Sequence, residues 1–116
     1  MVEITEAQLK QGIIEYLQYG MNQLKWWFTR LNSGQAFVKR GNKYYAIQLS
    51  DAGTADLLVI KRREFSYGRP RVIFIELKSR RGKTSPDQDA FKVLVESQGA
   101  SYAVVRSLEE LQEIIG

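Results

Sequence analysis

Hydrophobic residues recur with helical spacing near the start of the chain. Leu9, Ile13 and Leu17 follow one another at intervals of four, which places them on one face of a helix. Thr5 is a suitable N-cap residue, because its hydroxyl can accept a hydrogen bond from an unpaired amide of the first turn. The pattern therefore predicts a helix over residues 5–18.

The middle of the chain changes to short segments rich in β-branched and aromatic residues, which are typical of strands. Turn-forming residues separate them at 32–34 (NSG), at 41–43 (GNK) and in a basic loop that contains glycine. The predicted strands are 23–31, a short one at 36–40, 44–49, 55–60 and 71–78. The last two are the strongest, and they are expected to pair as an antiparallel hairpin.

A second helix is marked by its first turn. Ser85 is a good N-cap residue, Pro86 suits the first helical position, and Gln88 completes a capping box with Ser85. Gly99 is a plausible C-cap. The predicted helix therefore runs from this capping box to about residue 98.

The end of the chain adds one strand and one helix. Residues 101–106 form a short apolar strand, and Ser107 with Glu110 makes a second capping box that opens a terminal helix. The predicted core has the order α-β-β-β-α-β-α. A strand–helix–strand crossover near the end favours an α/β fold with a mixed central sheet flanked by helices.

Composition limits the function. The chain has 116 residues, 44% of them hydrophobic and 26% charged, which fits one globular domain over 1–116. No apolar run approaches the roughly 18–20 residues needed to cross a bilayer. No secretion-signal pattern opens the sequence. An intracellular protein that is not secreted and does not enter a membrane is expected.

Two residue types are missing. Without cysteine there is no disulfide framework, thiolate nucleophile or cysteine-liganded zinc. Without histidine there is no Ser-His-Asp triad and no imidazole base. Any catalysis must therefore use carboxylates, lysine, hydroxyl groups or a metal held by oxygen ligands.

Charge is unevenly distributed along the chain. Residues 25–83 hold fourteen Lys/Arg and four Asp/Glu, a net charge of +10, whereas 1–24 and 84–116 together hold three and nine, a net charge of −6. Such a field favours a polyanionic partner, nucleic acid first and an anionic membrane second. A solvated basic face without a ligand is the alternative.

Two acidic residues lie on the strongest pair of strands. If Ile60 pairs with Val72, the same register places Asp56 opposite Glu76 on one face of the sheet. A register displaced by one residue would send Asp56 to the other face. Two carboxylates that close repel each other unless a positive charge lies between them, and either Lys78 or a divalent metal can supply that charge.

These acids and the lysine have a structural and a chemical interpretation. In the first, Glu76 and Lys78 form a buried ion pair, and Asp56 caps a turn. In the second, Asp56 and Glu76 hold Mg²⁺, while Lys78 orients or deprotonates an attacking water or stabilises phosphate charge. The GTAD sequence that ends at Asp56 and the basic surroundings favour the second interpretation.

Two helical residues are candidates to complete such a site. Glu6 lies three, seven and eleven positions before the apolar residues of the first helix and so shares their face, whereas Glu15 does not. Its alternative role is that of a first-turn acid that stabilises the helix dipole. Gln88 shares the face of Phe91 and Val95, and it can position water or phosphate as well as cap its helix.

Taken in order, five segments resemble the PD-(D/E)xK nuclease superfamily and, within it, the virus-type replication-repair nuclease branch (VRR-NUC). The segments are TEAQLKQGIIEYL (5–17), RLNSG (30–34), GTADLLVI (53–60), FIELKSRRGKTSPDQ (74–88) and GASYAVVRSLEEL (99–111). The resemblance covers nearly the whole chain. One departure is that Ala55 stands where the superfamily has the proline before its aspartate.

The resemblance implies a restriction-endonuclease-like fold and a set of site residues. The metal, Mg²⁺ or Mn²⁺, would be held by Asp56, Glu76 and the Leu77 carbonyl group. Lys78 would be the catalytic lysine, and Glu6 and Gln88 would complete the catalytic set. The implied DNA contacts are Arg30, Asn32, Ser33, Arg80, Arg81 and Lys83. Each of these flanking residues can equally be a solvated loop residue.

The same resemblance implies a metal-dependent, structure-selective DNA endonuclease that hydrolyses phosphodiester bonds. The expected form is a homodimeric Holliday-junction resolvase acting on branched DNA in phage-type replication or repair, in the cytoplasm of a bacterium or of a phage-infected host. The WWF segment (26–28) is a possible dimer or DNA surface, although at least one tryptophan is expected in the core. The alternatives are a flap or general structure-specific nuclease, and a non-catalytic DNA-binding module with a relic site.

Overall fold

The computed structural model describes residues 3–31, 34–62 and 69–115. Two of the implied DNA contacts, Asn32 and Ser33, lie outside the described residues. Within these ranges the elements follow in the order α1 (Glu6–Asn22), β1 (Trp27–Arg30), β2 (Gly34–Arg40), β3 (Lys43–Ser50), β4 (Leu57–Lys61), β5 (Arg71–Leu77), α2 (Pro86–Ser97), β6 (Ser101–Val105) and α3 (Leu108–Ile115).

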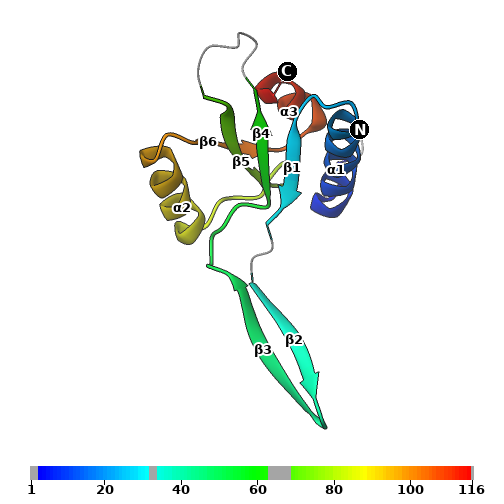
Figure 1. Cartoon of the computed structure of the whole chain (residues 1–116), viewed down its shortest axis with the longest axis vertical. Coiled ribbons are helices and arrows are strands. Elements are labelled where there is room, and N and C mark those ends of the chain that lie inside the picture. The colour runs from blue at the N-terminus through cyan, green and yellow to red at the C-terminus, as the bar shows by residue number, and fades with distance from the viewer. Residues whose placement is uncertain (1–2, 32–33, 63–68, 116) are drawn as a thin grey trace.

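The central sheet is mixed, as predicted. Its strands lie in the order β1-β4-β5-β6; β1, β4 and β5 are antiparallel neighbours, and β6 runs parallel to β5 (Figure 1). The predicted strands at 36–40 and 44–49 do not join this sheet. They form the separate hairpin β2–β3, which is inserted between β1 and β4. With the hairpin set aside, the element order is α-β-β-β-α-β-α.

One face of the sheet forms the hydrophobic core. Alternation along β5 turns Ile73, Ile75 and Leu77 to this face, where they are buried. Helices α1 and α3 cover it and contact each other. The helical residues that complete the core are Leu9, Ile13, Leu17, Leu111 and Ile115. The predicted apolar stripe of the first helix is therefore confirmed.

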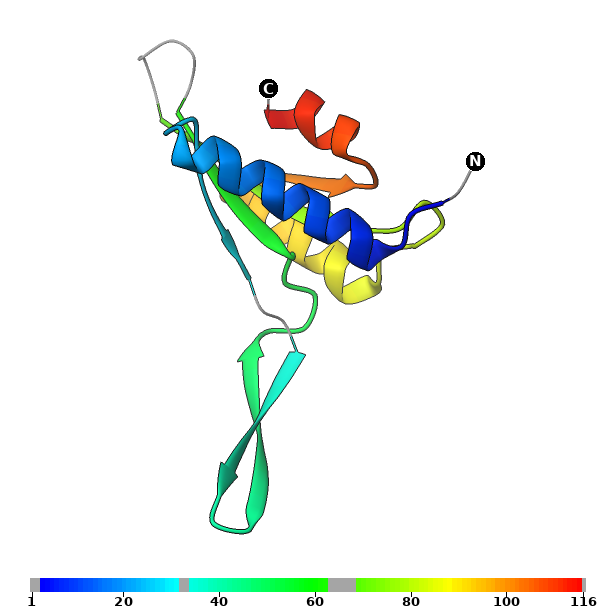
Figure 2. The same cartoon turned by 90° about the vertical axis from the view of Figure 1, so that its right-hand side faces the viewer.

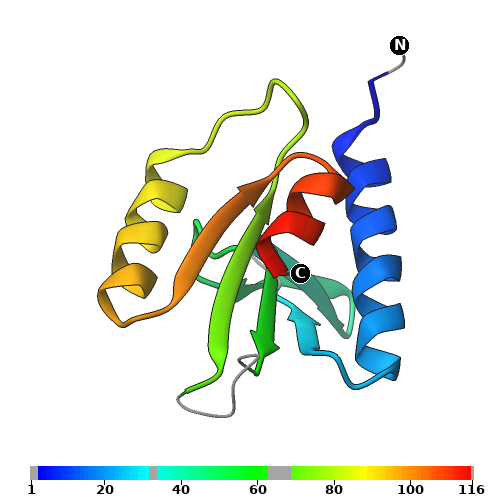
Figure 3. The same cartoon turned by 90° about the horizontal axis from the view of Figure 1, so that it is seen from above.

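Helix α2 lies on the opposite side of the sheet from α1, next to β6 (Figure 3). Its contact is aromatic: Phe91 meets Phe74 of β5 edge to face, with ring centres 5.2 Å apart, and lies 6.1 Å from the ring of Tyr102 on β6. The outer side of α2 leaves Val93 and Leu94 exposed. On β5, Val72 and Phe74 of this face are half-buried, whereas Ile73 and Ile75 of the core face are fully buried, so this face of the sheet is less covered.

The first helix begins where it was predicted and ends later. Thr5 is the N-cap, and Gln8 forms a capping box with it. The helix continues to Asn22 instead of residue 18, and the following strand begins at Trp27 instead of residue 23.

Among the described helices, none combines the length and the apolar character that a transmembrane span requires.

Trp26 explains the later boundary. Its indole N–H donates a hydrogen bond to the carbonyl oxygen of Leu17, at 2.8 Å, and its ring lies 5.6 Å from that of Tyr16. Gly20 makes this contact possible, because a Cβ there would come within 2.0 Å of the indole ring. Trp26 is therefore the packed tryptophan of the WWF segment, while Trp27 on β1 is 49% exposed.

The two later helices begin as predicted, with one correction. Ser85 and Gln88 form the expected capping box, with Pro86 in the first turn. At α3 the Ser107 hydroxyl accepts the Glu110 amide, but the Glu110 carboxylate accepts the backbone N–H of Arg106 instead of that of Ser107. The second capping box is thus only half formed.

The end of α2 also differs slightly from the prediction. Gln98 is the C-cap residue, and Gly99 follows it with a φ of 92°. This left-handed backbone conformation suits glycine, and it is common one residue after a C-cap. The glycine therefore ends the helix as expected, although one position further out.

Candidate functional site

The register supposed for residues 55–60 and 71–78 is the one observed between β4 and β5. Ile60 pairs with Val72, and the pairing continues without a shift to the first residue of β4. One residue before β4, the same register brings Asp56 opposite Glu76, the next-to-last residue of β5. Opposed residues share a face of the sheet. Two acidic residues of neighbouring chain segments therefore meet at one end of the sheet.

A cavity of about 400 Å³ lies at this end of the sheet. Its walls come from the first turns of α1 and α2, the residue before β4 and the end of β5. The lining residues are Glu6, Ala7, Lys10, Asp56, Glu76, Leu77, Lys78 and Gln88. All five residues predicted to be catalytic line it, together with Leu77. Lys10 was not predicted, although its spacing of four from Glu6 on one helix could have indicated it.

Asp56 is fixed by two hydrogen bonds. Its carboxylate oxygen Oδ2 accepts the backbone N–H of Leu77 at 2.8 Å, and its backbone oxygen accepts the N–H of Leu31 at 2.8 Å. The nearby turn is held instead by the carbonyl oxygen of Asp51, which accepts both the amide and the hydroxyl of Thr54. Asp56 is therefore held toward β5 and is not the cap of a turn.

Glu76 is buried, with 3% of its surface exposed. The pKa of its carboxyl group is raised to about 8, first by burial and then by a hydrogen bond to Asp56, the charge of Asp56 and that of Glu6. The charge of Lys78 lowers this pKa but does not outweigh the other effects. No Glu76–Lys78 ion pair is present in the described part of the chain. The pair of acids thus holds a proton at neutral pH.

The donor set fits a hard divalent cation. Two acids that keep a proton between them can exchange it for a cation, and carboxylate and carbonyl oxygens are the ligands that Mg²⁺ and Mn²⁺ prefer. Within residues 3–31, 34–62 and 69–115, no group of three or more acidic side chains is arranged to hold a metal. Two carboxylates and waters or substrate oxygens are a usual set for Mg²⁺. Asp56, Glu76 and the carbonyl oxygen of Leu77 are the residues that could contribute.

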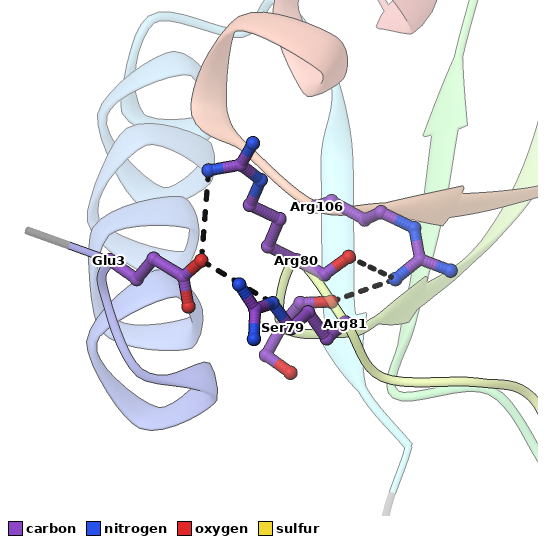
Figure 4. A network of polar contacts seen from close by, with 5 residues as sticks. All are labelled: Glu3, Ser79, Arg80, Arg81 and Arg106. Atoms are coloured by element: carbon purple, nitrogen blue, oxygen red, sulfur yellow. Dashed lines mark hydrogen bonds and ion pairs between the residues drawn. The ribbon is translucent and has the colours of Figure 1, made fainter. Parts of the chain in front are cut away.

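Arg106 was not predicted from the sequence, and it organises the loop that follows Lys78. Its guanidinium nitrogen Nη1 donates to the carbonyl oxygen of Ser79 at 2.7 Å and more weakly to that of Arg80 at 3.3 Å (Figure 4). The same nitrogen donates to the carbonyl oxygen of Gly82 at 2.6 Å. The Lys78 amide itself donates to β6. An arginine at the end of a strand gives no local sign of such long-range contacts.

Three of the implied DNA contacts lie on this loop. Arg80 and Arg81 are exposed, and both lie near one carboxylate oxygen of Glu3, at 3.6 Å and 3.7 Å (Figure 4). Lys83 is exposed as well. Exposed ion pairs of this kind contribute little to stability, so both arginines can be released to a phosphate.

The remaining described contact is separate from this loop. Arg30 is exposed at the end of β1, where it pairs with Leu57 at the start of β4. It does not line the cavity, yet it belongs to the same end of the sheet as Asp56. The structure therefore groups one implied contact near the first acid and three on the loop beyond the second acid.

Gly53 holds the loop before Asp56 against α2. Its φ is 87°, and a Cβ at this position would lie 2.3 Å from the backbone oxygen of Asp87. Both the backbone conformation and the close contact require glycine. The GTAD segment thus owes its glycine to the packing of this loop against the first turn of α2.

Tyr102 is a further residue that was not predicted from the sequence. Its hydroxyl oxygen is buried and has no hydrogen-bond partner among the described residues. Burial and, to a smaller extent, the charges of Glu76, Asp89 and Asp56 together raise the pKa of its phenol to about 12. The phenol therefore lies within the field of the acids, although it does not line the cavity.

The site thus consists of two opposed acids, a lysine, an amide and a further acid around one cavity. Four chain segments that are distant in sequence supply these groups. A basic loop, held by Arg106, follows directly after the lysine. Comparisons with protein-family models, with curated proteins and with solved structures find no match for this chain.

Proposed function

We propose that the protein is a DNA endonuclease that depends on Mg²⁺ or Mn²⁺. The observation that carries the proposal is the meeting of Asp56, Glu76 and Lys78 at one cavity, within the most basic part of the chain. Acids placed among so many cations serve no purpose in binding DNA alone, since they repel phosphate. They are useful where a cation lies between them and the phosphate.

The chain's own residues would divide the work as follows. Asp56, Glu76 and the Leu77 carbonyl group would hold the cation. When bound, the cation supplies positive charge that polarises the scissile phosphate. The hydrogen bond from the Leu77 amide keeps the Asp56 carboxylate in place without the cation, so part of the site is preorganised.

The other residues would act on phosphate and water. The Lys78 ammonium group can donate to a phosphate oxygen and stabilise the negative charge that develops there. The Gln88 side-chain oxygen accepts the Ser85 amide, which leaves its NH₂ group to donate to phosphate or water. Glu6 offers a carboxylate that can accept a hydrogen bond from the attacking water.

The proposed substrate is branched DNA, cut by a homodimer acting as a Holliday-junction resolvase. Support comes from the resemblance to the VRR-NUC branch and from an element order that fits a restriction-endonuclease-like core once β2–β3 is set aside. A two-fold dimer would present two such cavities to a four-way junction and cut two strands symmetrically.

The test is cleavage of four-way junctions, flaps and plain duplexes in Mg²⁺, in Mn²⁺ and in EDTA, with the cut positions mapped. We expect paired symmetric cuts that require the cation, and losses of about 10²-fold or more in Asp56→Asn and Lys78→Ala. Glu15→Gln and Lys92→Ala change exposed charges that do not line the cavity, and these variants should cut normally. Cleavage that survives both site variants would refute the assignment.

The same panel separates the alternatives. Single cuts beside one arm of a flap would identify a flap nuclease instead of a resolvase. Binding of branched DNA without any cleavage in either metal would identify a DNA-binding module with a relic site. Cleavage of all substrates at similar rates would indicate a general nuclease.

A further inference from the structure

The hairpin β2–β3 extends away from the rest of the protein (Figures 1 and 2). Its contacts are made almost entirely between its own two strands, joined by a two-residue turn in which Gly41 has a φ of 62°. An isolated two-stranded hairpin is marginally stable in water, because it buries little apolar surface. A projecting hairpin of this length therefore gains from contact with a partner.

The pairing register divides the side chains of the hairpin between two faces. The Arg40 face consists of Ala36, Val38, Arg40, Lys43, Tyr45 and Ile47, and the Phe37 face consists of Phe37, Lys39, Tyr44 and Ala46. Both faces expose large side chains: Phe37 is 69% exposed, Tyr44 67% and Tyr45 51%. Apolar groups exposed together on both sides of one ribbon mark an interaction site.

Charge identifies the class of partner. Residues 34–50 contain three cations and no acid. Arg40 and Lys43 stand directly opposite each other at the tip, and like charges in this position destabilise a hairpin. Lys39 precedes Arg40 in the strand and belongs to the Phe37 face, where its nitrogen Nζ lies 5.9 Å from the ring centre of Tyr44. A polyanion between or beside these groups removes the repulsion, whereas the same cationic tip of a second copy adds to it.

The strand that precedes the hairpin ends beside the candidate site. The strand before it ends at Arg30, which pairs with the first residue of β4, and Leu31 donates its amide to the carbonyl oxygen of Asp56. A strand of seven residues spans about 23 Å, the length of roughly seven base pairs of duplex. DNA that reaches the acids can therefore run beside the hairpin.

We propose that the β2–β3 hairpin is a DNA-binding arm that lies in a groove of the duplex beside the cleavage site. The major groove, about 12 Å wide, admits a two-stranded ribbon. Lys39, Arg40 and Lys43 contact phosphates, while Phe37 and Tyr44 pack against sugars and base edges. This inference rests on the proposed nuclease function and adds a second binding surface to it.

Binding of an inactive protein tests the arm without cleavage. In the Lys78→Ala background, Arg40→Gln/Lys43→Gln is compared with Lys25→Gln/Lys92→Gln, which removes the same charge from exposed positions outside the hairpin. Fluorescence anisotropy with a labelled four-way junction and a duplex is measured at salt concentrations from about 50 to 300 mM. We expect the arm pair to weaken binding roughly tenfold and to reduce the salt slope by about 2, and the control pair to change neither.

The apolar part of the arm is tested separately. Phe37→Thr/Tyr44→Thr removes two aromatic rings and keeps residues that favour strands. Binding should weaken while the salt slope stays unchanged, because no charge is lost. Thermal unfolding should match the parent in both arm variants, since the hairpin makes few contacts with the core.

Two results would contradict the proposal that the β2–β3 hairpin is a DNA-binding arm. One is DNA binding by both arm variants that equals that of the control pair. The other is a change from dimer to monomer in sedimentation caused by either arm variant, which would make the hairpin a contact between copies of the chain.

Failure of the arm and failure of the nuclease are distinguishable. If wild-type protein cuts DNA and the arm variants bind DNA as the control pair does, the DNA-binding role of the hairpin is wrong and the nuclease function is supported. If wild-type protein never cuts in Mg²⁺ or Mn²⁺ while the arm variants lose DNA binding, the arm stands as a DNA contact and the nuclease is wrong.

Discussion

Glu76 stands opposite Asp56, and the pair of carboxyl groups holds a proton at neutral pH. Neither carboxyl group would keep that proton in water at the same pH. The pKa of Glu76 is raised from its ordinary 4.5 to about 8, first by burial and then by Asp56. Lys78 opposes this shift, and Glu6 adds to it. The arrangement costs stability wherever the unfolded chain has already lost the proton that the folded chain retains.

The first prediction concerns the pH dependence of stability in EDTA. The favourable contribution of protonated Glu76 is complete below pH 4.5 and is lost as the pH rises toward about 8. The free energy of unfolding should therefore fall in this window by up to about 1.4 kcal/mol per pH unit. Urea unfolding between pH 5 and 8 measures it.

Glu76→Gln is the matching variant, because an amide cannot lose this proton. The free energy of unfolding of this variant should depend less on pH. It should therefore rise relative to that of wild type as the pH increases. Glu15→Gln, at an exposed position of α1, should retain the wild-type slope. Parallel slopes in wild type and Glu76→Gln would mean that the buried acid does not hold the proton.

The second prediction concerns cation binding. A divalent cation that takes the place of the shared proton must release it, so binding should be stronger at pH 8 than at pH 5.5. Mixing the protein with Mn²⁺ in weak buffer at pH 7 should acidify the solution by up to about one proton per chain. Calorimetry in two buffers of different ionisation enthalpy counts the same protons.

Asp56→Asn should abolish the proton release and the rise in melting temperature that Mn²⁺ gives to wild type. Lys78→Ala should retain both, since the lysine is not proposed to hold the cation. Equal stabilisation of wild type and Asp56→Asn by Mn²⁺ would place the cation elsewhere.

Local patterns were enough to predict much of the site. Thr5 and Ser85 mark helix starts through interactions within one turn. Alternation shows which residues of the two strong strands share a face, and one supposed pair, Ile60 with Val72, was then enough to bring Asp56 opposite Glu76. These features depend on neighbours in sequence or on a single pairing.

Other features depend on contacts that no local pattern encodes. Trp26 prolongs the first helix by packing back onto it, and Arg106 binds carbonyl groups more than twenty residues away. Alternation predicted strands at 36–40 and 44–49, but it does not say which sheet a strand joins. The two strands pair only with each other, a choice that depends on which chain segments meet in space.

The third prediction concerns Gly53. An alanine there must adopt a φ near 87° and bring its Cβ against the backbone of Asp87. Gly99→Ala is the matched control, because its φ is 92° but nothing lies within 4 Å of its Cβ. Gly99→Ala should lose about 1–2 kcal/mol of unfolding free energy, and Gly53→Ala clearly more.

The difference between these two variants isolates the close contact from the backbone strain. Because the displaced loop carries Asp56, Gly53→Ala should also weaken Mn²⁺ binding, whereas Gly99→Ala should not. Equal losses of stability in both would show that the loop moves freely away from α2.

The fourth prediction concerns Arg106. Removing its guanidinium group in Arg106→Gln leaves the carbonyl groups of Ser79 and Gly82 without their charged donor, which should cost about 1.5–3 kcal/mol of stability. The loop then loses its fixed position after Lys78. We expect DNA cleavage well below the melting temperature to lose kcat while Mn²⁺ binding stays at the wild-type value.

Two variants separate positioning from charge in this prediction. Arg62→Gln removes an exposed arginine and should change neither stability nor kcat by much. Arg106→Lys keeps the positive charge, but its shorter side chain ends in an ammonium group that does not reproduce the position and planar geometry of the guanidinium donor, so it should recover only part of the loss. Full recovery by lysine would mean that Arg106 acts through its charge on DNA, and that the loop needs no clamp to place Lys78.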